Sequence, residues 1–200
     1  MMTRGEDGTV IKYKARFVAM GFTQRPGIDF EETFAGVVVV KTFRIMLVLL
    51  NEDSTFEMEH WDVKMAFTQA PLEEELFMEL PDGFELCEEE EGKKTFCETK
   101  TTHFCCRLKK SLYGLKQAAH NWQKMLVGYF TKIFFSATKA DPCLFFRKEK
   151  GEFCLISTHV DDIFILFSKK VSNPARDLFL SNDYILNEAY GRRKPRQTLT

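Results

Sequence analysis

The strongest constraint in this sequence is a pair of acidic residues set between two apolar runs. Residues 153–160 and 163–167 are rich in apolar and β-branched residues, and Asp161 and Asp162 stand between them. Short runs of this kind predict strands, and the acidic break predicts a hairpin with carboxylates at its turn. Two like charges about 4 Å apart repel by about 1 kcal/mol in water and about 4 kcal/mol at an effective dielectric of 20. Either solvent exposure of the turn relieves this repulsion, or a hard divalent cation such as Mg²⁺ does.

A third carboxylate, Asp62, ends another apolar run. Residues 55–63 predict a strand, and the residues after it predict a compact turn into a helix. If this strand lies beside the hairpin, the three carboxylates make the smallest cluster that holds two metal ions for phosphoryl transfer. Periodicity does not decide whether the strands are neighbours, so solvated surface acids remain the alternative.

Two amphipathic helices and one further strand complete the expected elements. In residues 41–51 apolar side chains recur at i, i+3, i+4 and i+7, which predicts a helix. Residues 116–135 show a similar pattern, and Pro142 cannot continue that helix. Residues 10–20 mix β-forming with basic residues and predict a strand whose charges face outward. The stripe expected on the second helix is Ala119, Trp122, Leu126, Tyr129 and Ile133.

The formal net charge of −1 hides a segregation of charge along the chain. Residues 73–98 hold 11 acidic residues and two lysines, whereas residues 99–140 hold 8 basic residues and no acidic one. The basic stretch also contains interleaved aromatic residues, a combination that suits nucleic-acid phosphates and bases. A helix with a solvated lysine face and an aromatic core face gives the same composition. Both interpretations stay open, and the acidic block predicts an exposed loop near residues 85–100.

Composition excludes several classes of protein. With 44% hydrophobic and 28% charged residues, the chain has the balance of a globular protein rather than a disordered one. The N-terminus lacks the apolar segment of a secretory signal, and no run reaches the roughly 18 apolar residues of a membrane span. The 6 cysteines follow no secreted disulfide spacing, so we expect reduced thiols and an intracellular protein.

Five sequence motifs follow one another along the chain. They occupy residues 14–34 (KARFVAMGFTQRPGIDFEETF), 62–67 (DVKMAF), 108–117 (LKKSLYGLKQ, with Trp122 following), 139–144 (KADPCL) and 160–163 (VDDI). In this order they resemble the fingers motif, the first catalytic motif, the template and nucleotide-contact motif, a shorter motif and the Asp-Asp motif of the Ty1/copia-type retrotransposon reverse transcriptases. One such motif would be weak evidence, but five in the family's order and spacing are specific.

The resemblance implies an α+β right-hand polymerase fold. The palm and fingers would contain a mixed or antiparallel sheet packed on helices, without a thumb. Residues 1–9 would be a polar N-terminal segment and residues 10–168 the fingers and palm, with an acidic variable loop near 85–100. Residues 169–200 would be a degraded or truncated C-terminal tail, and the whole chain a fragment of a Pol polyprotein.

By the same resemblance, Asp62, Asp161 and Asp162 are the catalytic residues and the ligands of two Mg²⁺ ions, with Mn²⁺ as an alternative. The residues implied in nucleotide binding are Lys14, Arg16, Phe67, Tyr113 and Gly114. The lysine and the arginine would reach the triphosphate, and the phenylalanine would exclude a 2′-hydroxyl. The tyrosine and the glycine would line the pocket. Without the family context, both aromatic residues would be interpreted as packing residues.

The implied function is that of an RNA-directed DNA polymerase acting on an RNA or DNA template with a primer and deoxynucleoside triphosphates. It would act inside the cell, in a cytoplasmic virus-like particle, with no membrane partner. One departure lies at the proposed site, because His159 stands where the family usually has a tyrosine. Two alternatives remain: an inactive remnant that binds nucleic acid through residues 99–140, and an unrelated Mg²⁺-dependent phosphohydrolase.

Overall fold

The fold is built on one antiparallel sheet. The computed structural model describes residues 2–4, 7–13, 15–81, 105–149, 152–168 and 192–193. The sheet has the strand order β10–β3–β9–β8–β7–β6, and every neighbouring pair is antiparallel. Its strands are β3 (Phe56–Asp62), β6 (Ser136–Ala137), β7 (Leu144–Glu149), β8 (Glu152–His159), β9 (Asp162–Ser168) and β10 (Arg192–Arg193). The α+β class is therefore confirmed, with the sheet antiparallel rather than mixed.

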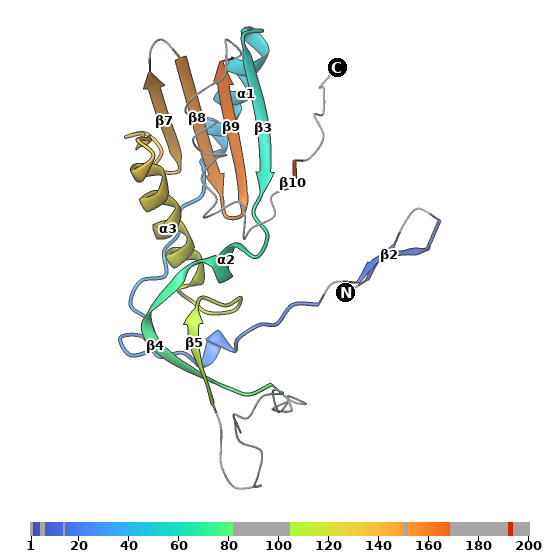
Figure 1. Cartoon of the computed structure of the whole chain (residues 1–200), viewed down its shortest axis with the longest axis vertical. Helices are drawn as coiled ribbons and strands as arrows, with labels where there is room; N and C mark the ends of the chain where they lie inside the picture. Colours follow the sequence, from blue (N-terminus) through green and yellow to red (C-terminus); the bar gives the residue numbers. More distant parts are fainter. Residues whose placement is uncertain are drawn as a thin grey trace, which may run out of the picture.

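Two helices pack on the sheet, α1 (Val40–Glu52) and α3 (Ala118–Lys132) (Figure 1). Successive residues of a strand point to opposite faces, so β9 serves two separate cores. Ile163 and Ile165 pack in a cluster with Trp122 of α3. Leu166 packs in a second cluster with Met46 of α1. Burial on both faces explains why β9 is almost continuously apolar in sequence.

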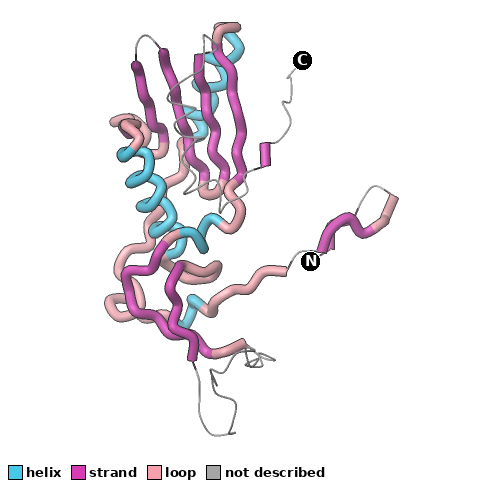
Figure 2. The backbone as a smooth tube through the Cα atoms, in the orientation of Figure 1, coloured by secondary structure: helices cyan, strands magenta, loops and turns pink. Residues whose placement is uncertain are grey.

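A smaller part of the molecule lies beyond the N-terminal end of α3. There β4 (Pro71–Glu79) pairs with β5 (Cys105–Lys110), and the short helix α2 (Ala66–Gln69) joins β3 to β4. The N-terminal strands β1 (Met2–Arg4) and β2 (Val10–Tyr13) form a separate ribbon that stands apart from the sheet (Figure 1). From Ala15 to Val39 the chain is largely loop, interrupted by the 3-10 turn η1 (Gly21–Thr23) (Figure 2).

The structure confirms most of the expected elements and corrects two. The helix at 41–51, the strand at 55–63 and the hairpin around Asp161 are confirmed. The strand expected over residues 10–20 ends at Tyr13, because residues 15–20 pair with no strand among the described residues. The second helix begins at Ala118 and buries Phe130 more deeply than Tyr129.

The remaining expectations concern the acidic loop, the C-terminal tail, the cysteines and membrane spans. The acidic loop near 85–100 and the tail at 169–200, apart from residues 192–193, lie outside the described residues. In the part that the structure describes, Cys105, Cys106 and Cys143 are free thiols. No described helix is long and apolar enough to cross a membrane.

Candidate active site

Strand pairing brings two of the three predicted carboxylates together. Asp62, the last residue of β3, is the cross-strand partner of Asp162, the first residue of β9. Directly opposed residues of an antiparallel pair point to the same face, with Cβ atoms about 4.5–5.5 Å apart. Asp161 lies in the adjoining turn, and its carbonyl oxygen accepts a hydrogen bond from Val63 N at 2.8 Å. The two strands are thus hydrogen-bonded neighbours, which the sequence left undecided.

The side chain of a histidine contacts one of these carboxylates, that of Asp162. His60 Nε2 contacts a carboxylate oxygen of Asp162, and the imidazole stacks on the ring of Phe164 with a centroid separation of 4.4 Å. His60 lies two residues before Asp62, so both side chains project from the same face of β3. His60 was not predicted as a site residue from the sequence, although its i, i+2 spacing from Asp62 is the signal that points to it.

The three carboxylates do not converge in this structure. Among the described residues, no group of three or more His, Cys, Asp or Glu side chains could hold a metal ion. Asp162 is engaged by His60, and Asp161 precedes β9, so strand alternation does not place it on the face that Asp62 and Asp162 share. Carboxylate oxygens are nevertheless the ligands that Mg²⁺ prefers. The residues therefore fit Mg²⁺ in their chemistry and backbone position, without forming a preassembled cage.

Two aromatic rings and a guanidinium lie together near these carboxylates. The rings of Phe67 and Tyr113 have centroids 5.0 Å apart, and the guanidinium carbon of Arg16 lies 5.7 Å from the Tyr113 ring centre. Partial burial raises the pKa of Tyr113, and the charges of Asp161 and Asp62 add to that rise against the opposing charge of Arg16. The tyrosine hydroxyl is therefore within electrostatic range of both carboxylates.

Gly114 allows the segment that carries Arg16 to approach Tyr113 closely. Its φ is +93°, and a Cβ there would lie 2.2 Å from the carbonyl oxygen of Ala19. Ala19 N donates a hydrogen bond to the carbonyl oxygen of Tyr113 at 2.8 Å. Three predicted nucleotide-site residues thus come together from separate segments, and Gly114 lies beside them. Lys14 lies outside the described residues.

Part of the basic stretch is neutralised by the acidic strand β4. Lys124 of α3 pairs with Glu73 at 2.6 Å, and Arg107 of β5 pairs with Glu75 at 3.2 Å. The hydrogen bond from Lys124 is the largest cause that lowers the pKa of Glu73. Some of the basic charge expected on a nucleic-acid surface is therefore already balanced within the fold.

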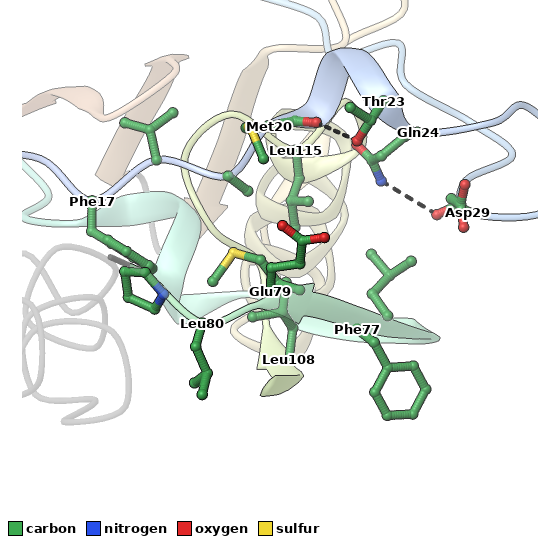
Figure 3. Close-up of a pocket in the computed structure, with 15 residues that line it drawn as sticks. Phe17, Met20, Thr23, Gln24, Asp29, Phe77, Glu79, Leu80, Leu108 and Leu115 are labelled. Atoms are coloured by element: carbon green, nitrogen blue, oxygen red, sulfur yellow. Dashed lines mark hydrogen bonds between the residues drawn. The ribbon is translucent and has the colours of Figure 1, made fainter. Parts of the chain in front are cut away.

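A cavity of about 630 Å³ lies between the loop around residues 17–29 and the β4–β5 ribbon. Figure 3 shows Phe17, Leu80, Leu108 and Leu115 among the side chains that line it. Of the predicted catalytic and nucleotide-site residues that the structure describes, none belongs to this lining. The cavity is therefore distinct from the carboxylates.

The comparison with known proteins identifies the family. The family described as reverse transcriptase (RNA-dependent DNA polymerase) matches residues 2–174. The chain belongs to the reverse transcriptase family. It is 39% identical over 82% of its length to the Retrovirus-related Pol polyprotein from transposon TNT 1-94 of Nicotiana tabacum. It is also 35% identical over 80% of its length to the corresponding polyprotein from transposon RE1 of Arabidopsis thaliana.

The transposon Ty1-BL Gag-Pol polyprotein of Saccharomyces cerevisiae is 30% identical over 88% of the chain. The chain spans only 11%, 10% and 9% of these three relatives, so it corresponds to the reverse transcriptase part of a Ty1/copia-type Pol polyprotein. No solved structure matches the chain.

Two further residues of this reverse transcriptase domain have structural roles that were not predicted from the sequence. Trp122, expected as a core residue, donates its indole N–H to the carbonyl oxygen of Val160 in the turn before Asp161. Asp141, within the motif at 139–144, is buried and accepts a hydrogen bond from Val39 N at the start of α1. Neither contact has a signal in local periodicity, because each joins segments far apart in the chain.

Proposed function

We propose that this domain catalyses RNA-directed DNA synthesis, in which a primer 3′-hydroxyl attacks the α-phosphate of a deoxynucleoside triphosphate and pyrophosphate leaves. The helix-covered sheet would be the palm, and the β4–β5 ribbon with the loop from Ala15 to Val39 the fingers. The observation that carries the proposal is the cross-strand pairing of Asp62 with Asp162, with Asp161 in the adjoining turn.

In this proposal Asp62, Asp161 and Asp162 hold two Mg²⁺ ions, or Mn²⁺ in their place. When bound, such ions stabilise the attacking and leaving oxygens of the phosphoryl transfer. His60 has to release Asp162 before that carboxylate can contribute both of its oxygens. Because three carboxylates near one sheet end repel one another, bound cations would also relieve a cost that the fold otherwise carries.

The nucleotide would lie against the Phe67 and Tyr113 rings. A flat ring at this place rejects a 2′-hydroxyl by excluded volume, which would make Phe67 the selector for deoxyribose. Arg16, together with Lys14, would pair with triphosphate oxygens through charge-assisted hydrogen bonds. Gly114 keeps the Arg16 segment against Tyr113, and in that sense it supports the pocket.

Primer extension on poly(rA)/oligo(dT) with purified protein tests the mechanism. Asp62→Asn, Asp161→Asn and Asp162→Asn should each reduce incorporation by about 100-fold or more, since several kcal/mol of transition-state stabilisation would be lost. Glu52→Gln, an exposed carboxylate at the far end of α1, should leave incorporation unchanged. Urea unfolding curves verify that every variant is folded. Undiminished incorporation by Asp162→Asn would contradict the assigned mechanism.

A second candidate is an inactive remnant that retains nucleic-acid binding. The contact between His60 and Asp162, together with the lack of a three-ligand cluster among the described residues, favours it. This candidate predicts binding of a template–primer duplex that weakens steeply with salt, with no incorporation by the wild-type chain. Measurable incorporation by the wild type excludes it.

A further inference from the structure

The turn that carries Asp161 has an unfavourable backbone conformation. The β8–β9 hairpin closes with a two-residue loop, Val160 and Asp161, between His159 and Asp162. Val160 has φ +58°, in the left-handed region that β-branched residues rarely enter. Backbone conformations of this kind persist only where the surroundings hold them.

Two hydrogen bonds from outside the hairpin hold this loop. Trp122 of α3 donates its indole N–H to the carbonyl oxygen of Val160, with 2.6 Å between Nε1 and O. Val63 donates its backbone N–H to the carbonyl oxygen of Asp161 at 2.8 Å. One loop carbonyl thus accepts a hydrogen bond from α3, and the other accepts one from the residue that follows β3. Neither hydrogen bond involves a carboxylate.

The side chain of Trp122 is held in position by the packing of the core around it. Its side chain is 2% exposed and packs in the cluster that contains Val63, Leu126 and Ile163. The indole N–H is directed at the loop by a ring that the core does not allow to rotate. The donor in α3 and the acceptor in the loop are 38 residues apart in sequence.

We propose that Trp122 is a positioning residue, whose indole N–H holds the Val160–Asp161 loop against the end of β3 and so fixes the backbone position from which Asp161 projects. The inference rests on the proposed function for the role of that carboxylate. Without the indole N–H, the carbonyl of Val160 loses its partner and the loop can relax away from its left-handed conformation. Asp161 then moves relative to Asp62, and a divalent ion is bound less tightly.

The test uses Trp122→Phe, which keeps an aromatic ring in the core and removes the donor. Replacing Trp122 with 3-benzothienylalanine, which matches the indole in size but lacks its N–H, serves if the phenylalanine variant does not fold. Leu126→Val is the matched control, because Leu126 lies one turn further along the same buried stripe of α3.

The first measurement is amide hydrogen exchange by NMR. Exchange of the Val63 amide should accelerate by at least about tenfold in the Trp122 variant, because the loop it bonds to opens more often. The Phe135 amide, which bonds to the carbonyl of Phe130 at 2.9 Å, should keep its protection. Leu126→Val should leave the Val63 amide as in the wild type. Unchanged Val63 exchange in the Trp122 variant would overturn the proposal.

The second measurement is Mn²⁺ affinity, followed by the EPR signal of free Mn²⁺. The Trp122 variant should bind Mn²⁺ about tenfold more weakly, the size of effect typical of groups that orient metal ligands, while Leu126→Val should bind it normally. Faster Val63 exchange with unaltered Mn²⁺ affinity would also overturn the positioning role. Absence of Mn²⁺ binding by the wild type would overturn the proposed metal site, whereas the exchange measurement tests the anchor independently of it.

Discussion

Replacing Asp141 should destabilise the domain through the start of α1. Asp141 is 1% exposed, and its carboxylate accepts hydrogen bonds from Val39 N and Cys143 N, each at 2.9 Å. A third hydrogen bond comes from the side chain of Thr42. Val39 precedes the first residue of α1 and has no capping side chain of its own. Asp141 therefore caps a helix 102 residues away in sequence.

The expected cost follows from the groups left without partners. Asp141→Ala removes the acceptor of two backbone N–H groups, and each unsatisfied buried donor costs about 1–3 kcal/mol. The free energy of unfolding should therefore fall by about 2–6 kcal/mol. Asp141→Asn keeps one acceptor oxygen but loses the charge, so a smaller loss of about 1–3 kcal/mol is expected. Glu52→Gln, at the exposed end of the same helix, should change stability by less than about 0.5 kcal/mol.

The effect should also depend on pH. Burial alone would raise the pKa of Asp141, but the hydrogen bonds from Val39, Thr42 and Cys143 outweigh it and hold the pKa below its ordinary value of 3.8. A carboxyl whose folded pKa is depressed stabilises the fold fully above its unfolded pKa and loses that contribution as the pH falls through the folded pKa. The stability gap between wild type and Asp141→Asn should therefore be largest near pH 6 and shrink as the pH falls below 4.

Urea unfolding followed by circular dichroism, at pH values from 6 to 3, measures both quantities. The m-value should stay constant between wild type and variants if the change acts on the folded state. A loss below about 0.5 kcal/mol for Asp141→Ala at pH 6, or a gap that does not narrow on acidification, would refute the capping argument.

Two further predictions use the same protein. Gly114→Ala should lower the free energy of unfolding by more than about 1 kcal/mol, because its Cβ would clash with the carbonyl of Ala19 and its φ is positive. The matched change Gly128→Ala, in α3 with open space around the new Cβ, should instead raise stability by about 0.5–1 kcal/mol, and equal effects in urea unfolding would contradict this reasoning. Exposed Cys105 should react with iodoacetamide well before Cys143, because burial and a neighbouring carboxylate raise the pKa of Cys143. Peptide mass spectrometry measures both rates, and similar rates in the folded chain would count against the burial of Cys143.

Elements whose apolar pattern continues over many residues were predictable from the sequence. α1, α3 and the β8–β9 hairpin each bury a stripe or two faces, so their side-chain pattern records the environment they fold into. The strand expected at residues 10–20 fails after Tyr13 for the opposite reason. β-forming side chains favour a pleated surface, but residues 15–20 pair with no strand in the part of the chain that the structure describes.

The candidate site shows where local pattern stops being informative. Its residue types were predictable, because Asp62 and the Asp161–Asp162 pair each end an apolar run. Its geometry depends on strand register, and a slip of one residue would move Asp62 to the face opposite Asp162. In this structure the hydrogen bond from Val63 to Asp161 and the one from Trp122 to Val160 tie the loop to β3 and α3. The position of the carboxylates therefore depends on core residues that take no part in the proposed chemistry. For this reason the motif could be recognised from the sequence, whereas its geometry could not.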